Sequence, residues 1–337
     1  MPQQPIASVA VIVVNYGTPE LALAAVESVL ARGHGGRRVE VHLVDNASPG
    51  GDAAAFRAAH ADRGWRGRVT LHPEAVNHGF GRANNLVLAA LAARGDPPDA
   101  VFLLNPDARL EGEAIDRLAR ALEADPRAGF AGAGIARPGD GPVTAAFRFP
   151  SLPAEFERAI AFGPVSRALS RWRVPLAPDH PAGPVDWVSG AAVMIRRATL
   201  DAIGPFDPDF FLYYEEVELM RRGARAGWRC LYVPEARVVH EEGAATAIRS
   251  GRAVAERYPA YRYEAWRLYH LKTAGRAGAA AAALAVMAGA ACGRGLGVLR
   301  GRQVGVPNFA GDFWAHAARP LLTGRPAGPR GGRGRSR

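Results

Sequence analysis

The chain has 337 residues, 48% of them hydrophobic, which is enough for one large α/β domain with an appendage or for two small domains. The net charge is +10, but the segment from Arg294 to Arg337 holds nine arginines and one acid, a net of +8. Residues 1–293 therefore carry only about +2. No nucleic-acid-binding surface is expected on the main fold. The two cysteines, Cys230 and Cys292, cannot build a disulfide framework and fit a reducing, cytoplasmic environment.

The first third of the chain alternates segments typical of strands with segments typical of helices. The expected strands are short β-branched or apolar runs at residues 7–14, 39–44, 69–72 and 100–104. The expected helices are residues 19–32, 56–62, 82–93 and 115–122. This alternation predicts an α/β fold in which a mostly parallel, doubly wound sheet is covered by helices.

Polar residues follow three of these strands directly. Asn15 and Tyr16 follow the first strand, Asp45 and Asn46 the second, and Asn105-Pro106-Asp107 the fourth. The carboxyl ends of parallel strands meet at one edge of the sheet, where ligands bind in this class of fold. A surface loop can carry one such group by chance, whereas three together indicate a site.

The rest of the chain is less regular. Residues 138–184 are rich in Pro, Gly and Arg and should form loops and short helices. Further strands are expected at 186–196, 228–233 and 237–240, a helical turn at 198–203, and a helix from Glu215 to Ala226. We therefore divide the chain into a domain of residues 1–250, a helical appendage of residues 251–323 and a disordered Arg/Gly tail of residues 324–337.

Two apolar segments bear on membrane contact. The N-terminal run MPQQPIASVAVIVV is short and lacks a charged leader, which favours a first strand over a secretory signal or a membrane span. Residues 277–293 carry no charge, but they are mostly Ala and Gly. A helix that packs on the domain or lies on a bilayer surface is favoured there over a transmembrane helix.

Asp107 is a candidate metal ligand. It ends the buried run VFLLNPD and is presented by a turn that Pro106 fixes. A hard divalent cation takes oxygen ligands, often one carboxylate together with substrate phosphates. The alternative is an Asp that only caps the turn or the next helix.

Several motifs, taken together in this order, resemble the family 2 glycosyltransferases and, within them, the rhamnosyltransferase-like branch. The resemblance covers about residues 8 to 243 and rests on VIVVNYGTPE, VHLVDNAS, NHGFGRANN, FLLNPDARL, WVSGAAVMIRR, IGPFDPDFFLYYEEVEL and GWRCLYVPEARVVH. It implies the GT-A fold, a Rossmann-like sheet flanked by helices, with a nucleotide-sugar donor and a divalent metal.

The resemblance also implies donor-binding residues. Asp45 resembles the residue that meets the base of the donor, where a carboxylate can accept a hydrogen bond from the imino N–H of thymine or uracil and Asn46 can add a second bond. Asn77, Gly79 and Asn84 resemble the turn over the nucleotide and the sugar, although an ordinary glycine loop remains the alternative. The strand-end residues Asn15, Tyr16 and Asn105 complete the expected donor site.

The metal ligands and the base are carried over in the same way. Asp107 resembles the metal-binding Asp of the family, in an Asn-Pro-Asp variant, and His240 resembles a later histidine that completes the site. Manganese or magnesium would suit this set, although a lone His after a strand is usually structural. In FFLYYEEVEL, Glu216 stands where the family places its catalytic Asp, and its extra methylene changes the geometry of the base.

The spacing on the expected helix favours Glu216 over Glu215 as the base. Glu216 shares its side with Leu219 and Met220, and a carboxylate beside an apolar stripe is expected to face a cleft. Neighbouring acids should raise its pKa, which helps a base near neutral pH. Glu218 has Arg221 and Arg222 at ion-pair spacing, which is typical of a solvated salt bridge.

We therefore expect an inverting, metal-dependent glycosyltransferase, with dTDP-rhamnose or else a UDP-sugar as donor. The expected acceptor is a hydroxyl of a glycan or lipid-linked molecule in cell-envelope synthesis. The basic tail would hold the enzyme at the inner face of the plasma membrane. Two alternatives are a non-catalytic nucleotide-sugar-binding protein and an RNA-binding protein that uses the Arg-Gly tail.

Overall fold

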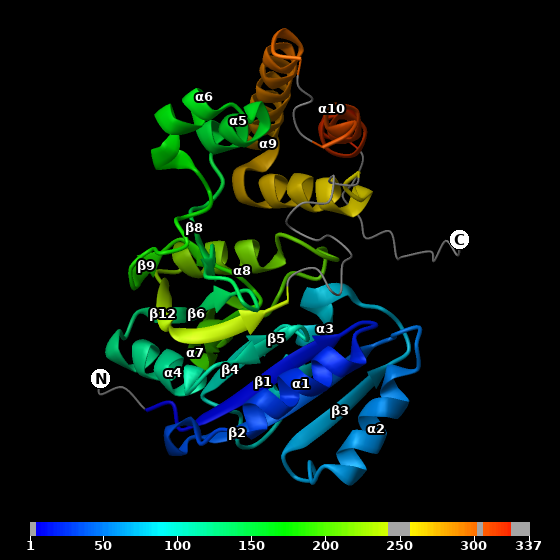
Figure 1. The fold of residues 1–337 in the computed structure, drawn as a ribbon, viewed down its shortest axis with the longest axis vertical. Coiled ribbons are helices and arrows are strands. Elements are labelled where there is room, and N and C mark those ends of the chain that lie inside the picture. Colours follow the sequence, from blue (N-terminus) through cyan, green and yellow to red (C-terminus); the bar gives the residue numbers. More distant parts are fainter. Residues whose placement is uncertain (1–4, 242–256, 302–305, 325–337) are drawn as a thin grey trace.

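The computed structural model describes residues 5–241, 257–301 and 306–324 (Figure 1). Within these residues, one sheet forms the centre of the molecule. Its hydrogen-bonded order is β3 (Val69–Glu74), β2 (Arg38–Asn46), β1 (Ser8–Asn15), β4 (Ala100–Leu104), β11 (Ala192–Arg196), β6 (Ala128–Ala136), β12 (Arg229–His240) and β5 (Ala108–Leu110). The short strands β7 (Pro142–Val143) and β9 (Gly183–Val185) pair with β6 and β12.

Most of the sheet is parallel, as the alternation of strands and helices predicts. The strands β1 to β4 run in one direction, and β6 and β12 are parallel to each other. The exception at the centre is β11, which is antiparallel to both β4 and β6. In the register of β1 and β2, Asn15 lies opposite Asp45, so the polar ends of these strands are neighbours.

Helices cover both faces of the sheet, and each face has its own hydrophobic core. One face carries α1 (Pro19–Leu30), α2 (Asp52–Asp62) and α4 (Ala114–Ala124), and the other carries α3 (Gly79–Ala92), α7 (Arg197–Ile203) and α8 (Glu215–Arg225). The helical spacing predicted for α4 is confirmed, because Ile115, Leu118, Ala119 and Leu122 are all fully buried. Each large aliphatic side chain buried in this way stabilises the fold by about 1.5–3 kcal/mol.

The prediction of one strand over residues 186–196 is wrong, because the strand is interrupted. Trp187 and Val188 form β10, which leaves the main sheet and pairs with β8 (Ala146–Phe147), and the main sheet resumes only at Ala192. The rings of Trp187 and Phe147 stack with their centroids 4.0 Å apart. Between β10 and β11, the Ala191 carbonyl accepts a hydrogen bond from the Asn105 N–H.

The two strands predicted over 228–233 and 237–240 form one strand, β12. Its register against β6 shifts between Val233 and Arg237, so residues 234–236 form a bulge. The partner strand β6 escapes prediction because its sequence, AGFAGAGIA, has few residues of high β propensity. Close packing explains its glycines, since a Cβ on Gly132 would lie 2.4 Å from Cβ of Val188.

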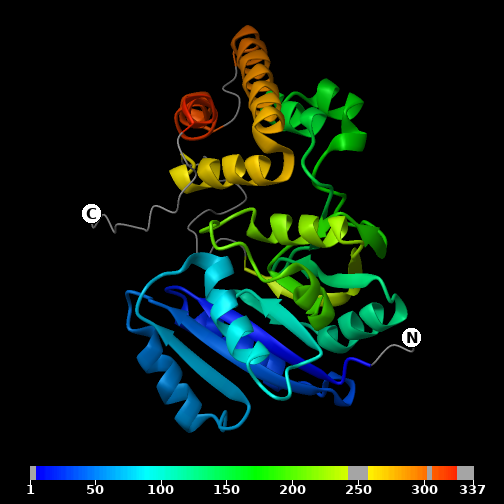
Figure 2. The same cartoon turned by 180° about the vertical axis from the view of Figure 1, so that it is seen from behind.

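A separate helical layer stands beyond α8 (Figures 1 and 2). It contains α5 (Leu152–Ile160), α6 (Gly163–Ala168), α9 (Ala260–Leu299), α10 (Phe309–Phe313), a π-helical turn at Trp314–Ala318 and α11 (Arg319–Thr323). Gly275, with φ of 67°, turns α9 sharply, so its two segments point in different directions. The helical layer thus combines the predicted appendage with α5 and α6 from the segment that was predicted to form short helices.

Residues 277–293 lie in the second segment of α9. By length and composition, α9 is the one helix in the described residues that could cross a membrane, a test that the core helix of a soluble protein also passes. Ala282, Ala283 and Val286 are buried against other parts of the helical layer. One side of the segment therefore packs on protein, as the favoured interpretation of the sequence expects. The predicted disordered tail, apart from Gly324, lies outside the described residues.

Candidate functional site

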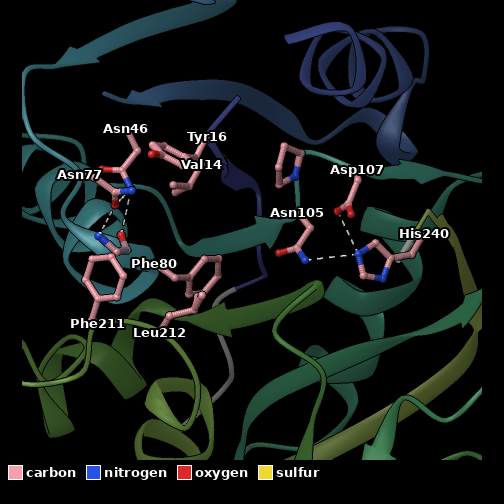
Figure 3. A pocket seen from close by; sticks show the side chains of 12 residues that line it. Val14, Tyr16, Asn46, Asn77, Phe80, Asn105, Asp107, Phe211, Leu212 and His240 are labelled. Atoms are coloured by element: carbon pink, nitrogen blue, oxygen red, sulfur yellow. Dashed lines mark hydrogen bonds and ion pairs between the residues drawn. The ribbon is translucent and has the colours of Figure 1, made fainter. Parts of the chain in front are cut away.

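A pocket of about 240 Å³ opens at the carboxyl edge of the sheet (Figure 3). The ends of β1, β2 and β4, the start of α3, the segment before α8 and the end of β12 all contribute to it. Its lining consists of Val14, Tyr16, Asn46, Asn77, Gly79, Phe80, Asn105, Pro106, Asp107, Phe211, Leu212 and His240. The structure therefore brings together seven of the twelve predicted site residues.

Asp107 and His240 face each other at one end of the pocket (Figure 3). Nε2 of His240 lies 2.9 Å from Oδ1 of Asp107, and Nδ2 of Asn105 lies 3.4 Å from the same ring nitrogen. Strand pairing holds them there, because β12 is antiparallel to β5 with His240 opposite Ala108, and the Glu241 N–H donates to the Asp107 carbonyl. Residues 133 positions apart are thus fixed side by side by backbone hydrogen bonds.

The geometry of this pair fits two ligands of one divalent cation. Two adjacent ligands, each about 2.1 Å from an octahedral ion, lie about 3 Å apart, which is close to the separation of Asp107 Oδ1 and His240 Nε2. No group of three His, Cys, Asp or Glu side chains suited to a metal is present among the described residues. Further ligands would therefore have to come from a substrate or from water, the usual arrangement for magnesium.

Asn46 organises the turn that forms the opposite wall of the pocket. Its Nδ2 donates to Asn77 Oδ1 at 3.0 Å and to the Gly79 carbonyl at 3.2 Å, and its Oδ1 accepts from the His78 N–H at 2.9 Å. Asn77 Oδ1 also accepts from the Gly79 N–H. The turn before α3 is therefore held in place by two amide side chains that line the pocket.

Gly79 allows two segments to meet across the pocket. Its φ is +75°, and a Cβ at this position would lie 2.0 Å from the carbonyl oxygen of Phe211. That carbonyl accepts a hydrogen bond from the N–H of Phe80. No residue with a side chain fits here without moving the backbone, so the start of α3 and the segment before α8 form one unit.

Two residues predicted to bind the donor, Asn15 and Asn84, do not line the pocket. Asn15 is fully buried, and its amide contacts Thr18, Ser48 and Asp52. Asn84 is also fully buried, and its Nδ2 donates to the Phe80 carbonyl one turn earlier in α3. Because neither amide has exposed surface, neither can contact a ligand in this conformation.

Asp45 lies beside the pocket and not in it. Successive residues of a strand point to opposite sides, so Asp45 faces away from its neighbour Asn46. It lines a second cavity of about 210 Å³ together with Arg57, His72 and Pro73. Its Oδ1 accepts from the Ser48 N–H, which fixes the carboxylate. Tyr16, 41% exposed, borders the main pocket.

Glu215 and Glu216 begin α8 and are neighbours of the pocket, although neither lines it. A Cβ on Gly190 would lie 3.5 to 3.9 Å from the Glu216 side chain, and the next residue, Ala191, accepts a hydrogen bond from the Asn105 N–H at 2.9 Å. Glu216 therefore stands beside the turn that contacts the Asn105 end of the pocket. Glu215 packs on the other side, near Gly81 of α3.

Both carboxyl groups resist ionisation. Burial raises the pKa of Glu215 well above its ordinary value, and the neighbouring charge of Glu216 raises it further. Burial likewise raises the pKa of Glu216, against the effect of backbone N–H groups at the start of the helix. Within the described chain, one oxygen of each carboxyl group is buried without a hydrogen-bond partner. A buried carboxyl group with a raised pKa is suited to proton transfer near neutral pH.

The residues before α8 have an unusual backbone. Tyr213 and Tyr214 both have positive φ, 73° and 67°, a conformation that costs about 1–2 kcal/mol in a residue with a side chain. Such strain is concentrated at functional sites. The predicted ion pair of Glu218 is confirmed with Arg222 at 2.8 Å, but Glu218 is buried and not solvated. The carboxylate of Glu218 is thus held away from the pocket.

Sequence reasoning missed the apolar walls of the pocket. Val14, Phe80, Phe211 and Leu212 line it without any polar signal in the sequence. A usable signal was their position, since Phe80 follows Gly79 and Phe211 stands four residues before Glu215. Ligand pockets are mostly apolar with a few polar groups, so these side chains are expected around a candidate site.

A family model described as glycosyltransferase like family 2 matches residues 5–258. The chain is a member of this family. Over 219 residues it is 33% identical to the N-acetylglucosaminyl-diphospho-decaprenol L-rhamnosyltransferase of Mycobacterium tuberculosis strain H37Rv, which covers 62% of this chain and 69% of that protein. It is 25% identical over 167 residues to the rhamnosyltransferase WbbL of Escherichia coli K12, covering 48% of this chain and 61% of that protein.

Solved structures place this family 2 glycosyltransferase in the GT-A fold. A mannosyltransferase from Pyrobaculum calidifontis, in complex with GDP-Man and Mn²⁺, matches 95% of this chain and 82% of its own with a TM-score of 0.54 and 18% identity. GalNAc-T7 with UDP, GalNAc and Mn²⁺ matches 95% of this chain and 57% of its own with a TM-score of 0.55 and 14% identity. The predicted family and fold are confirmed.

Proposed function

We propose that this glycosyltransferase moves rhamnose from dTDP-rhamnose to a hydroxyl of a lipid-linked glycan in cell-envelope synthesis. The names of its relatives support the sugar, since two are rhamnosyltransferases, and the mycobacterial one is named for N-acetylglucosaminyl-diphospho-decaprenol. A UDP-sugar is the second candidate donor. The Asp45 carboxylate does not separate the two, because thymine and uracil present the same imino N–H.

The observation that carries the proposal is the pair formed by Asp107 and His240 at one end of the pocket. Together with the phosphate oxygens of the donor, these side chains would hold manganese or magnesium. When bound, the ion would neutralise the negative charge that develops on the departing diphosphate. Asn105 Nδ2 lies 3.4 Å from His240 Nε2, the nitrogen that would bind the ion, so the Asn105 amide stands beside the metal position.

Glu216 is our candidate for the general base. It would accept the proton of the acceptor hydroxyl while that oxygen bonds to the anomeric carbon and the bond from this carbon to the diphosphate oxygen breaks. A single displacement of this kind inverts the anomeric configuration. The support for Glu216 over Glu215 is its contact with the Gly190 turn, which leads to Asn105, whereas Glu215 packs toward α3.

The other predicted donor residues have two kinds of role, contact with the donor and support of the residues that contact it. Tyr16, Asn46, Asn77 and Gly79 line the pocket and would contact the donor. Asn15 and Asn84 are positioning residues that support the strand end and the helix from behind. We further propose that the reaction takes place in the cytoplasm at the inner face of the plasma membrane, with the helical layer in peripheral contact with lipid.

The test is release of nucleotide diphosphate from a panel of donors. The purified full chain is incubated with dTDP-rhamnose, UDP-sugars or GDP-sugars, with manganese or with EDTA, and compared with Asp107→Ala. We expect release that requires both the metal and Asp107, fastest with dTDP-rhamnose. Calorimetry in the same buffers completes the test. Failure of every nucleotide sugar to bind would overturn the proposal, and tight binding without transfer to any acceptor would favour a non-catalytic binding protein.

A further inference from the structure

The helical layer contains a further cavity, larger than the donor pocket and away from it. It measures about 610 Å³ and is lined by α5, the start of the first segment of α9, the second segment of α9 and the chain leading into α10. Three arginines line it, Arg158, Arg262 and Arg294. Among the described residues of its lining there is no acidic side chain.

The positive charge of this cavity is only partly compensated. Arg158 contacts Glu155 at 2.6 Å, and the buried Glu155 carboxylate is also 3.4 Å from His270. Although burial opposes ionisation, Arg158 and His270 lower the pKa of Glu155 to about 2, so it offsets one positive charge. In the described part of the chain, neither Arg262 nor Arg294 forms an ion pair with an acid. The cavity is therefore suited to a ligand with more than one negative charge.

The remaining walls of the cavity are largely apolar. Ala290 and Val298 stand one turn on either side of Arg294 on α9, and Tyr258 and Phe309 also line the cavity. Large exposed apolar side chains also gather on this layer, with Leu284, Val298 and Leu299 exposed by 72%, 77% and 83%. Arginine beside exposed aliphatic residues is typical of contact with a lipid interface.

The cavity is connected to the donor pocket by one short segment. Phe211 and Leu212 line the donor pocket, and Tyr213 and Tyr214 follow with their strained backbone. The guanidinium of Arg262 lies 5.0 Å from the ring centre of Tyr213 and 4.3 Å from that of Tyr258. Arg262 thus stands between the cavity and the residues that lead directly into Glu216.

We propose that this cavity binds the diphosphate of an isoprenoid-linked acceptor, with the isoprenoid chain along its apolar wall. The proposal rests on the function proposed above and names the part of the acceptor that the helical layer recognises. Arg262 and Arg294 would donate hydrogen bonds to the diphosphate oxygens, and the chain would leave past Val298 toward the membrane. The glycan would then point along the segment 211–216 toward the donor pocket.

Binding of farnesyl diphosphate, a short soluble isoprenoid diphosphate, tests the proposal. The full chain is titrated in EDTA, so that metal-dependent binding of a diphosphate at the donor pocket does not contribute. Arg294→Gln and Arg262→Gln are compared with Arg276→Gln, a matched loss of one exposed arginine on α9 outside the cavity. Inorganic pyrophosphate and phosphatidylglycerol vesicles are titrated in parallel, to separate a diphosphate site and a general anionic surface from an isoprenoid diphosphate site.

We expect Arg294→Gln and Arg262→Gln each to weaken farnesyl diphosphate binding by about tenfold or more, because charged hydrogen bonds are lost. Arg276→Gln should bind as the wild type does, and pyrophosphate should bind more weakly than farnesyl diphosphate. The proposal is overturned if the wild type does not bind farnesyl diphosphate, if pyrophosphate binds equally well, or if all three variants lose the same affinity. Equal affinity of the wild type and Arg294→Gln would overturn it too.

The donor assay distinguishes failure of the cavity proposal from failure of the proposed function. Metal-dependent release of nucleotide diphosphate by the wild type, without arginine-dependent binding of farnesyl diphosphate, would refute the cavity and leave the glycosyl transfer intact. Arginine-dependent binding without any donor binding would keep the cavity as an isoprenoid diphosphate site and refute the proposed function.

Discussion

The contact between Gly79 and Phe211 gives the most exact prediction about the donor pocket. Alanine at position 79 would meet two separate costs. The first is backbone strain, because φ is +75°. The second is a steric conflict, because the new Cβ would lie 2.0 Å from the Phe211 carbonyl oxygen, where real contacts stay above 3.0 Å, so the backbone must move by about 1 Å.

The magnitudes follow from these two costs. A positive φ costs an alanine about 1–2 kcal/mol, part of which is offset by the lower entropy of the unfolded chain. Forcing the two segments apart adds about 1–3 kcal/mol. The hydrogen bond from the Phe80 N–H to the Phe211 carbonyl is then lost, which adds about 1 kcal/mol. We expect Gly79→Ala to lower the free energy of unfolding by about 3–5 kcal/mol.

Gly67 supplies a matched control. Its φ is +77°, and nothing lies within 4 Å of the position that a Cβ would take. Gly67→Ala therefore adds the backbone strain without the conflict and should cost about 1 kcal/mol. The assay is urea denaturation followed by tryptophan fluorescence, together with calorimetric titration of the nucleotide-sugar donor. Donor affinity should fall by about tenfold or more in Gly79→Ala only, because that variant separates two walls of the pocket.

Equal destabilisation of the two variants would refute this reasoning. It would mean that the start of α3 and the segment before α8 do not meet as closely as the structure has them. A large loss of stability in Gly79→Ala with unchanged donor affinity would be equally informative. It would separate the contact from the donor site and contradict the role of this turn in binding.

Further predictions concern individual side chains of the site. Because burial raises the pKa of Glu215, its ionised form opposes folding above the folded-state pKa, and this cost disappears as the pH falls toward the ordinary value. Glu215→Gln should therefore raise the unfolding free energy by about 1–3 kcal/mol at pH 8 and by much less near pH 4, and parallel stability curves would contradict this. Asn46→Ala loses three hydrogen bonds to the turn before α3 and should cost about 2–3 kcal/mol in urea denaturation, where an unchanged midpoint would argue against it. His240→Ala should raise the manganese concentration for half-maximal donor turnover by about tenfold or more, and an unchanged requirement would exclude His240 as a ligand.

Much of the architecture could be predicted because local patterns match it. The apolar spacing in α4 and the short, buried apolar runs of β1 and β4 are sufficient to identify those elements. The alternation of parallel strands with helices then places the carboxyl ends of β1, β2 and β4 at one edge of the sheet. Asn46 and Asp107 do lie in one pocket there. For such residues, the periodicity of the chain and the handedness of its connections determine position.

Other features depend on contacts that the sequence does not display. The strand β6 is made largely of Ala and Gly, and only its packing against Val188 explains that composition. Asn15 and Asn84 are buried and hydrogen-bonded within the fold. Their residue type and their position in the sequence suggested ligand contact, because the sequence does not show these hydrogen bonds. The association of α5 with α9 joins segments more than 100 residues apart, which no local pattern could indicate.

The most direct test of the account is the product of a single-turnover transfer to an isoprenoid-diphosphate-linked N-acetylglucosamine. Wild type and Glu216→Gln are compared with dTDP-rhamnose as donor, and the anomeric configuration of the product is read by nuclear magnetic resonance. We predict a rhamnosylated product of inverted configuration from the wild type, and a loss of at least about a hundredfold in rate with retained donor binding in Glu216→Gln. A product that retains the configuration of the donor, or undiminished transfer by Glu216→Gln, would contradict the account.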